Sequence, residues 1–218
     1  MPTVDQRRQR LARARLYFVT DSLTDPAVLR AALEGGADML QLRDFEVSDH
    51  DLLRAAATFR ELCDEHDALF WINDRPDLAL RAEADGVHVG QSDMNVEDAA
   101  QVTGGEMLIG LSTHSPDQLE RGIAASADQL SVGPVWETPT KPGRRAAGLA
   151  YVRHAAGLRP PVPWFAIGGI DSGNVREVVE AGAERVVVVR AVRDADDPRA
   201  AAAAIRAALE RRPIGTAQ

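Results

Sequence analysis

Short apolar runs recur along this chain, and a stretch with helical periodicity follows each of them. Runs of this length, rich in β-branched and aromatic residues, are typical of buried strands in a parallel sheet. The similar segments 34–38 and 180–184 both carry Gly where a helix gives way to a strand, which supports a repeated unit. The eight predicted strands are Leu16–Thr20, Met39–Arg43, Leu69–Asn73, Gly86–Gly90, Leu108–Ser112, Gln129–Gly133, Trp164–Gly168 and Arg185–Arg190. Eight strand–helix units predict a (β/α)8 TIM barrel of the α/β class, with a doubly wound open sheet as the alternative.

The domain organisation follows from this count. Residues 1–218 are expected to form a single barrel domain, since α/β barrels of this length are common. Residues 1–15 are predicted to be a short N-terminal helical extension, in which Leu11 lies among Arg and Ala at amphipathic spacing and which closes one end of the fold. Residues 134–147 form the longest loop and are expected to be an active-site flap.

Composition excludes several classes of partner. The formal net charge of −8 argues against nucleic acid, because a phosphate backbone requires a basic face. Cys63 is the only cysteine, so neither a disulfide framework nor a cysteine-based zinc site is expected. No apolar run approaches the length of a membrane span, and a cytoplasmic protein is therefore expected. The oligomeric state is left open, with a homo-oligomer among the alternatives.

Polar residues gather at the carboxyl ends of the predicted strands, where TIM barrels build their active sites. The period of two in a strand places Gln41 and Arg43 on one face. A polar side chain facing into a barrel costs free energy unless it is paired or reaches a ligand, and an Arg in this place can clamp a diphosphate. Asn73 and Ser112 end the third and fifth strands in the same way.

Two carboxylates follow neighbouring strands. Asp74 comes directly after the third strand and Asp93 shortly after the fourth, so both should leave the sheet at the same end and lie close together. With no His or Cys at ligand spacing, such a pair suits Mg²⁺, which is commonly held by one or two carboxylates and by substrate phosphates. The alternative is that each Asp caps the helix that follows it.

The last three strand ends suggest phosphate chemistry. The flap carries Thr138, Thr140 and Lys141, together with Arg144 and Arg145, and is suited to closing over a charged substrate; a solvated surface loop is the alternative. Gly168-Gly169 follows the seventh strand and Val189-Arg190 ends the eighth, which is where barrel enzymes usually hold phosphate. A tight turn would also explain the paired Gly. We expect Ser115-Pro116 to begin a helix and His114 to be structural.

Together these segments resemble the thiamine phosphate synthase family, from Leu16 to about Val192. The segments that carry the resemblance are 41–44 (Gln-Leu-Arg-Asp), 72–75 (Ile-Asn-Asp-Arg), 86–93, 110–114, 138–141 (Thr-Pro-Thr-Lys) and 166–170 (Ala-Ile-Gly-Gly-Ile). Members of that family are (β/α)8 barrels and transferases. They move the 4-amino-2-methylpyrimidin-5-ylmethyl group from its diphosphate to a thiazole phosphate, giving thiamine phosphate and diphosphate by a dissociative, Mg²⁺-assisted mechanism.

The resemblance also implies roles for individual residues. It implies that Arg43, Ser112 and Lys141 are catalytic and that Asp74 and Asp93 hold Mg²⁺. The implied ligands of the pyrimidine diphosphate are Gln41, Leu42, Arg43, Asp44, Phe45, Asn73, Ser112 and Lys141. The implied ligands of the thiazole phosphate are Thr138, Pro139, Thr140, Gly168, Gly169, Val189 and Arg190.

One position departs from the family pattern. The family usually has a diphosphate-binding Lys two residues after the Arg of the second strand, and this chain has Phe45 followed by Glu46. Arg43, Lys141, Arg144 or Arg145 are the candidates to compensate. Two alternatives remain: a thiazole tautomerase, which shares the barrel but does not need the carboxylate pair, and a non-catalytic phosphate-binding barrel.

Overall fold

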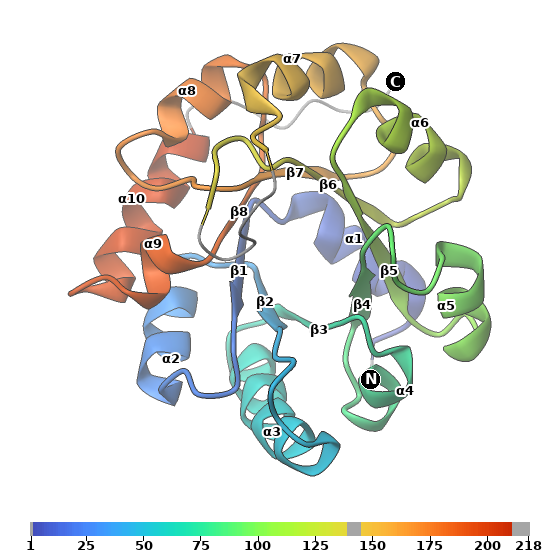
Figure 1. The fold of residues 1–218 in the computed structure, drawn as a ribbon. Coiled ribbons are helices and arrows are strands. Elements are labelled where there is room, and N and C mark those ends of the chain that lie inside the picture. The colour runs from blue at the N-terminus through green and yellow to red at the C-terminus, as the bar shows by residue number, and fades with distance from the viewer. Residues whose placement is uncertain (1, 139–144, 211–218) are drawn as a thin grey trace.

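The computed structural model describes residues 2–138 and 145–210. Eight parallel strands close into a barrel in sequence order, and helices surround them (Figure 1). The strands are β1 Leu16–Thr20, β2 Met39–Leu42, β3 Leu69–Asn73, β4 Gly86–Val89, β5 Leu108–Thr113, β6 Gln129–Val132, β7 Trp164–Ile167 and β8 Val186–Val188. The pairing of β1 with β8 closes the ring. The predicted (β/α)8 barrel is therefore confirmed, and the open sheet is excluded.

The helices follow the strands as the sequence predicts. They are α1 Val4–Arg13, α2 Pro26–Glu34, α3 Asp49–Glu65, α4 Pro76–Arg81, α5 Val96–Val102, α6 Pro116–Ala124, α7 Gly148–Leu158, α8 Val175–Glu180, α9 Arg190–Arg193 and α10 Pro198–Glu210. Ser115 caps α6 by accepting a hydrogen bond from the backbone N–H of Gln118, as expected of Ser115-Pro116. Gly36 and Gly182 adopt positive φ just after α2 and α8, which explains the repeated Gly. No helix in the described part of the chain has the length and apolar character that a membrane span requires.

Alternation along the strands creates two cores. Outward side chains such as Phe18, Leu40 and Phe70 pack under the helices. Inward side chains, among them Met39 and Trp71, fill the lower part of the barrel. Both sets are buried, because a parallel strand covered by helices is shielded on both faces. Among the described residues, side chains thus fill the lower part of the barrel, and a cavity lies at the carboxyl ends of the strands.

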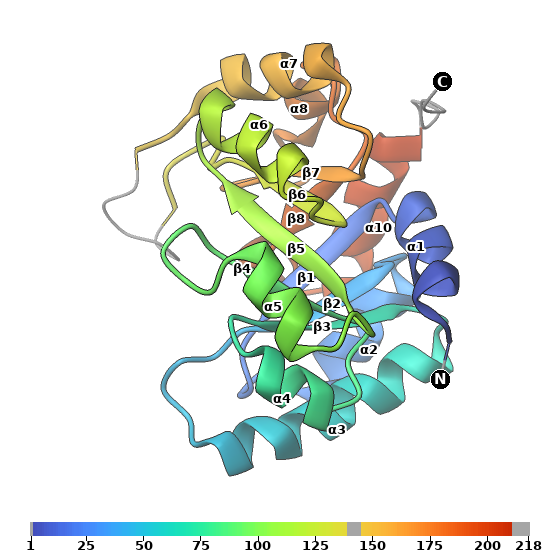
Figure 2. The same cartoon turned by 90° about the vertical axis from the view of Figure 1, so that its right-hand side faces the viewer.

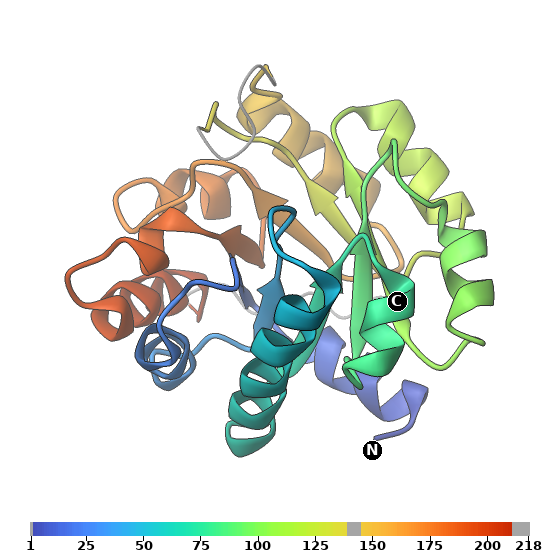
Figure 3. The same ribbon diagram turned by 60° about the horizontal axis from the view of Figure 1, so that its bottom comes forward.

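The N-terminal helix α1 closes the opposite end of the barrel. In Figure 2 the arrow of β5 points away from α1, so α1 lies at the amino-terminal ends of the strands. Figure 3 shows α1 beneath the strands. Leu11 is 1% exposed and enters the interior core with Met39, Leu69 and Trp71. Burying such a side chain contributes roughly 1.5–3 kcal/mol. The expected closing helix is therefore present.

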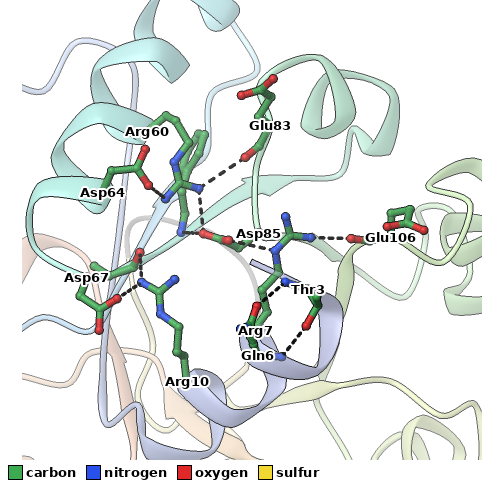
Figure 4. A network of polar contacts seen from close by, with 12 residues as sticks. Thr3, Gln6, Arg7, Arg10, Arg60, Asp64, Asp67, Glu83, Asp85 and Glu106 are labelled. Carbon is green, nitrogen blue, oxygen red and sulfur yellow. Dashed lines mark hydrogen bonds and ion pairs between the residues drawn. The ribbon is translucent and has the colours of Figure 1, made fainter. Parts of the chain in front are cut away.

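A buried ion network fastens α1 to the barrel (Figure 4). Asp85, which is 1% exposed, accepts from Arg7 Nε at 3.1 Å and from Arg60 Nη1 at 2.8 Å. The backbone N–H of Phe70 also donates to this carboxylate, at 2.8 Å. Arg7 in addition donates to the carbonyl of Glu106. Helices α1 and α3 and strand β3 thus meet at one carboxylate, which fixes the base of the barrel and leaves the other end to the site.

Several strands end earlier than the sequence predicts. The residues expected inside strands that lie beyond their ends are Arg43, Gly90, Gly133, Gly168, Val189 and Arg190, and Arg185 lies before β8. Strand β5 instead runs one residue further than predicted, to Thr113. Arg190 instead begins α9, and Gly168 has a φ of 109°, outside the range of a β-strand. Arg43 still donates its backbone N–H to the carbonyl of Thr20 at 2.8 Å. The residues beyond the strand ends therefore belong to the mouth of the barrel.

Candidate active site

A cavity of about 440 Å³ lies at the carboxyl ends of the strands. Of the residues predicted to bind the pyrimidine diphosphate, the cavity is lined by Gln41, Arg43, Asn73 and Ser112. Of those predicted to bind the thiazole phosphate, it is lined by Thr138, Gly168, Gly169, Val189 and Arg190. The structure thus brings both predicted groups to one space, the first from β2, β3 and β5 and the second from the last three strand ends.

Hydrogen bonds between inward side chains build the floor of the cavity. The Nε2 of Gln41 donates to the Tyr17 hydroxyl at 2.6 Å. His88 Nε2 and Ser112 Oγ lie 2.9 Å apart, and the amide of Gln129 donates to Ser131 Oγ at 3.1 Å. The large majority of buried polar groups in folded proteins have a hydrogen-bond partner of this kind. The pairs hold the polar atoms in fixed orientations beneath any ligand.

Two of these floor residues, Tyr17 and His88, had no role in the sequence-based prediction. Burial raises the pKa of Tyr17 well above its usual value, so the hydroxyl stays protonated and can both accept and donate. His88 is 6% exposed and lies in the middle of β4. Both are polar residues at inward positions, and the alternation that placed Gln41 and Arg43 on one face would have found them.

Gly110 keeps the floor open between these pairs. A Cβ added there would lie 2.5 Å from His88 Nδ1 and 2.6 Å from Gln129 Oε1. No side chain fits at such distances. Glycine is therefore required at this point of β5 by the close approach of polar groups from β4 and β6.

Arg43 reaches the cavity at the end of β2 and stacks on its neighbour. Its guanidinium carbon lies 4.5 Å from the centroid of the Phe45 ring, which is 61% exposed.

Asp44 accepts hydrogen bonds from the hydroxyl and the backbone N–H of Ser22, at 2.5 and 3.2 Å. Partial burial raises the pKa of Asp44, but the hydrogen bonds from Ser22 and from nearby backbone N–H groups outweigh it and lower the pKa. Leu42 is fully buried in the outer core, so only its backbone could reach a ligand.

Asp74 and Asp93 leave the barrel at the same end, as expected from neighbouring strands β3 and β4. Asp74 has a φ of 57° and accepts from the Asn73 amide at 2.5 Å. Asp93 accepts from the backbone N–H of Gly90 at 2.9 Å. Neither caps the following helix, since the N-cap is Arg75 in α4 and Asn95 in α5. The capping alternative is therefore wrong for both residues.

The turn after β7 is shaped by two glycines with positive φ, 109° at Gly168 and 69° at Gly169. A Cβ on Gly168 would lie 2.5 Å from the Cβ of Pro134. The carbonyl of Gly168 accepts from the backbone N–H of Trp136 at 3.0 Å, which ties the loop after β6 to the turn. The paired Gly thus allows a close approach of two loops, with backbone lining the cavity.

The end of β8 carries an ion network that the sequence did not reveal. Arg190 lines the cavity and lies 3.4 Å from Asp194. Arg193, also in the lining, contacts Asp194 at 2.7 Å and Asp21 of the loop after β1 at 3.0 Å. The hydrogen bond from Arg193 lowers the pKa of Asp194. These contacts join the first and last loops across the closing seam of the barrel.

The flap is described only in part. The flap residues outside the described part of the chain are Pro139, Thr140, Lys141 and Arg144, whereas Arg145 is described and is exposed.

His114 lines the cavity, and its Nδ1 donates to the carbonyl of Gly133 at 2.7 Å. This bond anchors the loop after β5 to the end of β6, in line with the structural role expected for His114.

Comparison with known proteins agrees with this geometry. The family model described as thiamine monophosphate synthase matches residues 16–192. A thiamine-phosphate synthase from Nostoc sp. is 52% identical over 194 residues, covering 88% of this chain and 55% of the relative. One from Saccharopolyspora erythraea is 48% identical over 213 residues, covering 93% of this chain and 96% of the relative.

A solved structure agrees with these relatives. A thiamine phosphate pyrophosphorylase from Pyrococcus furiosus superposes with a TM-score of 0.84 at 34% identity, covering 94% of this chain and 98% of that chain. The chain spans little more than half of the Nostoc and Synechocystis relatives, 55% and 59% of their lengths. The extent of the family match and these identities confirm the resemblance seen in the sequence. This chain belongs to the thiamine monophosphate synthase family.

Proposed function

We propose that this chain is a thiamine-phosphate synthase. It would transfer the 4-amino-2-methylpyrimidin-5-ylmethyl group from its diphosphate to thiazole phosphate, releasing diphosphate. The observation that carries the proposal is the single cavity in which Gln41, Arg43, Asn73 and Ser112 face Thr138, Gly168, Gly169 and Arg190. Two groups of ligands in one space suit a reaction that joins two phosphorylated substrates. The names of the Nostoc and Saccharopolyspora relatives support it.

The floor of the cavity suits the aminopyrimidine ring. Gln41 and Ser112 each hold one floor partner, Tyr17 and His88, so their polar atoms are fixed before a substrate arrives. A heterocycle with ring nitrogens and an amino group needs both donors and acceptors, and amide and hydroxyl groups supply both. Preorganised partners of this kind align the reacting methylene carbon with the second substrate.

The diphosphate would lie above this floor, toward Arg43, and Lys141 of the flap would add a second cation. An Arg offers a planar fork of N–H groups that matches phosphate oxygens, and a Lys supplies a point charge. Asn73 lines the same side of the cavity, next to Asp74. On the opposite side, Thr138, the backbone of Gly168 and Gly169, and Arg190 would hold the phosphate of the thiazole.

Asp74 and Asp93 would hold Mg²⁺, and the donor set fits this ion. Both are carboxylates, held in place through Asn73 and Gly90 respectively. In residues 2–138 and 145–210, no group of three or more His, Cys, Asp or Glu forms a closed metal cage. Mg²⁺ commonly takes one or two protein carboxylates and fills its other positions with water and phosphate oxygens. When bound, Mg²⁺ supplies neutralisation of the diphosphate charge.

The chemistry that these residues support is dissociative. The bond between the methylene carbon and the diphosphate oxygen breaks, and its electron pair leaves with the diphosphate. The thiazole nitrogen then donates its lone pair to the resulting pyrimidinylmethyl cation. Arg43 and Lys141 would stabilise the charge that builds up on the leaving group, while the floor residues keep the two rings aligned. No covalent bond to the protein is needed.

A direct assay tests the proposal. The purified protein is mixed with both substrates and Mg²⁺, and thiamine phosphate is measured by chromatography. Product is expected with the unchanged protein and at least tenfold less with Arg43→Gln, which removes a preorganised charge at the leaving group. Arg54→Gln is the matched control, because Arg54 is an exposed side chain of α3 paired with Asp51 outside the cavity. Absence of product from the unchanged protein would reject the proposal. Isomerisation of the thiazole phosphate alone would favour a tautomerase instead.

A further inference from the structure

Phe45 is an exposed aromatic residue at the mouth of the barrel. Its side chain is 61% exposed, yet the guanidinium of Arg43 lies over its ring at 4.5 Å from the centroid. A residue so exposed contributes little to the core. Its ordered contact is with a cation that lines the cavity. The described contact of the ring is thus with Arg43, and Phe45 lies outside both core clusters.

The turn that carries Phe45 is held on both sides. Asp44 accepts from the backbone N–H of Glu46 at 3.0 Å, which fixes the turn around Phe45. The same carboxylate accepts from the Ser22 hydroxyl at 2.5 Å and so ties the turn to the loop after β1. These hydrogen bonds stabilise the charged carboxylate and lower the pKa of Asp44. The ring of Phe45 is thus presented on a constrained backbone.

Stacking is a suitable way to place an Arg that must bind a diphosphate. An Arg side chain has several rotatable bonds, and ordering it on binding costs conformational entropy. An aromatic ring under the guanidinium restrains it beforehand and uses its face, whereas phosphate oxygens are bound by the N–H groups at its edge. A second cation at the same position would instead repel Arg43.

We propose that Phe45 is a positioning residue that presents Arg43 to the diphosphate of the substrate. The inference rests on the proposed function in that the ligand is the diphosphate of that reaction. Phe45 thereby supports diphosphate binding indirectly: it adds no contact of its own and orders the neighbouring guanidinium. Arg43 and Phe45 act as one unit.

The test measures binding of inorganic diphosphate in the presence of Mg²⁺ by calorimetry, together with kcat and KM for the pyrimidine diphosphate. Phe45→Leu removes the ring but keeps an apolar side chain, and binding should weaken about two- to fivefold, the size of an exposed cation–π contact. Phe45→Trp should restore binding to at least the original affinity, because indole is the best partner for a cation. Leu23→Ala is the control, since Leu23 is an 86% exposed apolar residue of the adjacent loop.

A double-mutant cycle decides whether the ring acts through Arg43. In the Arg43→Gln background, Phe45→Leu should cause no further loss of diphosphate affinity. An equal loss in both backgrounds, or unchanged affinity in Phe45→Leu alone, would overturn the inference. The binding arm does not need turnover. If Phe45→Leu weakens diphosphate binding but the protein makes no thiamine phosphate, this inference stands and the proposed function is rejected. If turnover is normal but diphosphate binding does not depend on the ring, the proposed function stands and this inference is rejected.

Discussion

Replacing the two carboxylates by their amides separates the charge of the proposed metal site from the shape of its loops. Asp74 has a φ of 57°, a left-handed conformation that Asn adopts nearly as readily as Asp. Ala would add about 1–2 kcal/mol of backbone strain at that position. Asp93 receives the N–H of Gly90 at 2.9 Å, and the amide oxygen of Asn can accept the same bond. Asp74→Asn and Asp93→Asn should therefore change the free energy of unfolding by only about 0.5 kcal/mol.

The effect on activity should be much larger. Each replacement removes one negative charge from a site that is proposed to hold a divalent cation against a diphosphate. Loss of one preorganised electrostatic group typically lowers kcat about 10²- to 10³-fold, or roughly 2.7–4 kcal/mol. Because the two carboxylates would serve one ion, the double variant should lose little more than either single variant.

The assay is formation of thiamine phosphate as a function of Mg²⁺ concentration, with urea unfolding as the stability measurement. Asp77→Asn is the matched control: Asp77 is an exposed carboxylate of α4 paired with Arg75, just after Asp74 in the sequence. Turnover within threefold of the unchanged protein in either Asn variant, or full activity in excess chelator, would refute the assignment of Mg²⁺ to these residues.

Three further predictions follow from buried groups. Asp85→Ala should destabilise the protein by about 3–5 kcal/mol in urea unfolding, because it leaves buried guanidinium groups without their carboxylate; a loss below 1 kcal/mol would contradict this. Gly110→Ala should lower the free energy of unfolding by about 1–3 kcal/mol and also lower substrate affinity, since the new Cβ would lie 2.5 Å from His88 Nδ1. Normal stability and a normal KM would show that the neighbouring side chains move aside to accommodate the methyl group. Burial raises the pKa of the Cys63 thiol, so a thiol reagent should label it only after unfolding, and rapid labelling of the native protein would disprove this.

The sequence determined the fold through periodicity. Apolar runs with strand character, each followed by a helical stretch, require a sheet covered by helices, and the number of repeats matched a closed barrel. It also predicted where a candidate site should lie, because polar residues in such a chain are tolerated at strand ends and costly elsewhere. Gln41, Asn73 and Ser112 were placed correctly at the cavity for this reason. The alternation that a strand imposes is local, so it can be seen in the sequence.

Only the tertiary structure decided which side chains meet across the barrel. The pairing of His88 with Ser112, and the meeting of Arg7, Arg60 and Phe70 at Asp85, join segments that are far apart along the chain. Sequence spacing carries no information about such contacts. Phe45 is the clearest case: the resemblance implied only that this position departs from the family pattern, whereas the structure shows a ring beneath Arg43. That contact depends on a turn held by Asp44 and on the path of the loop after β1, which the packing of the whole barrel sets.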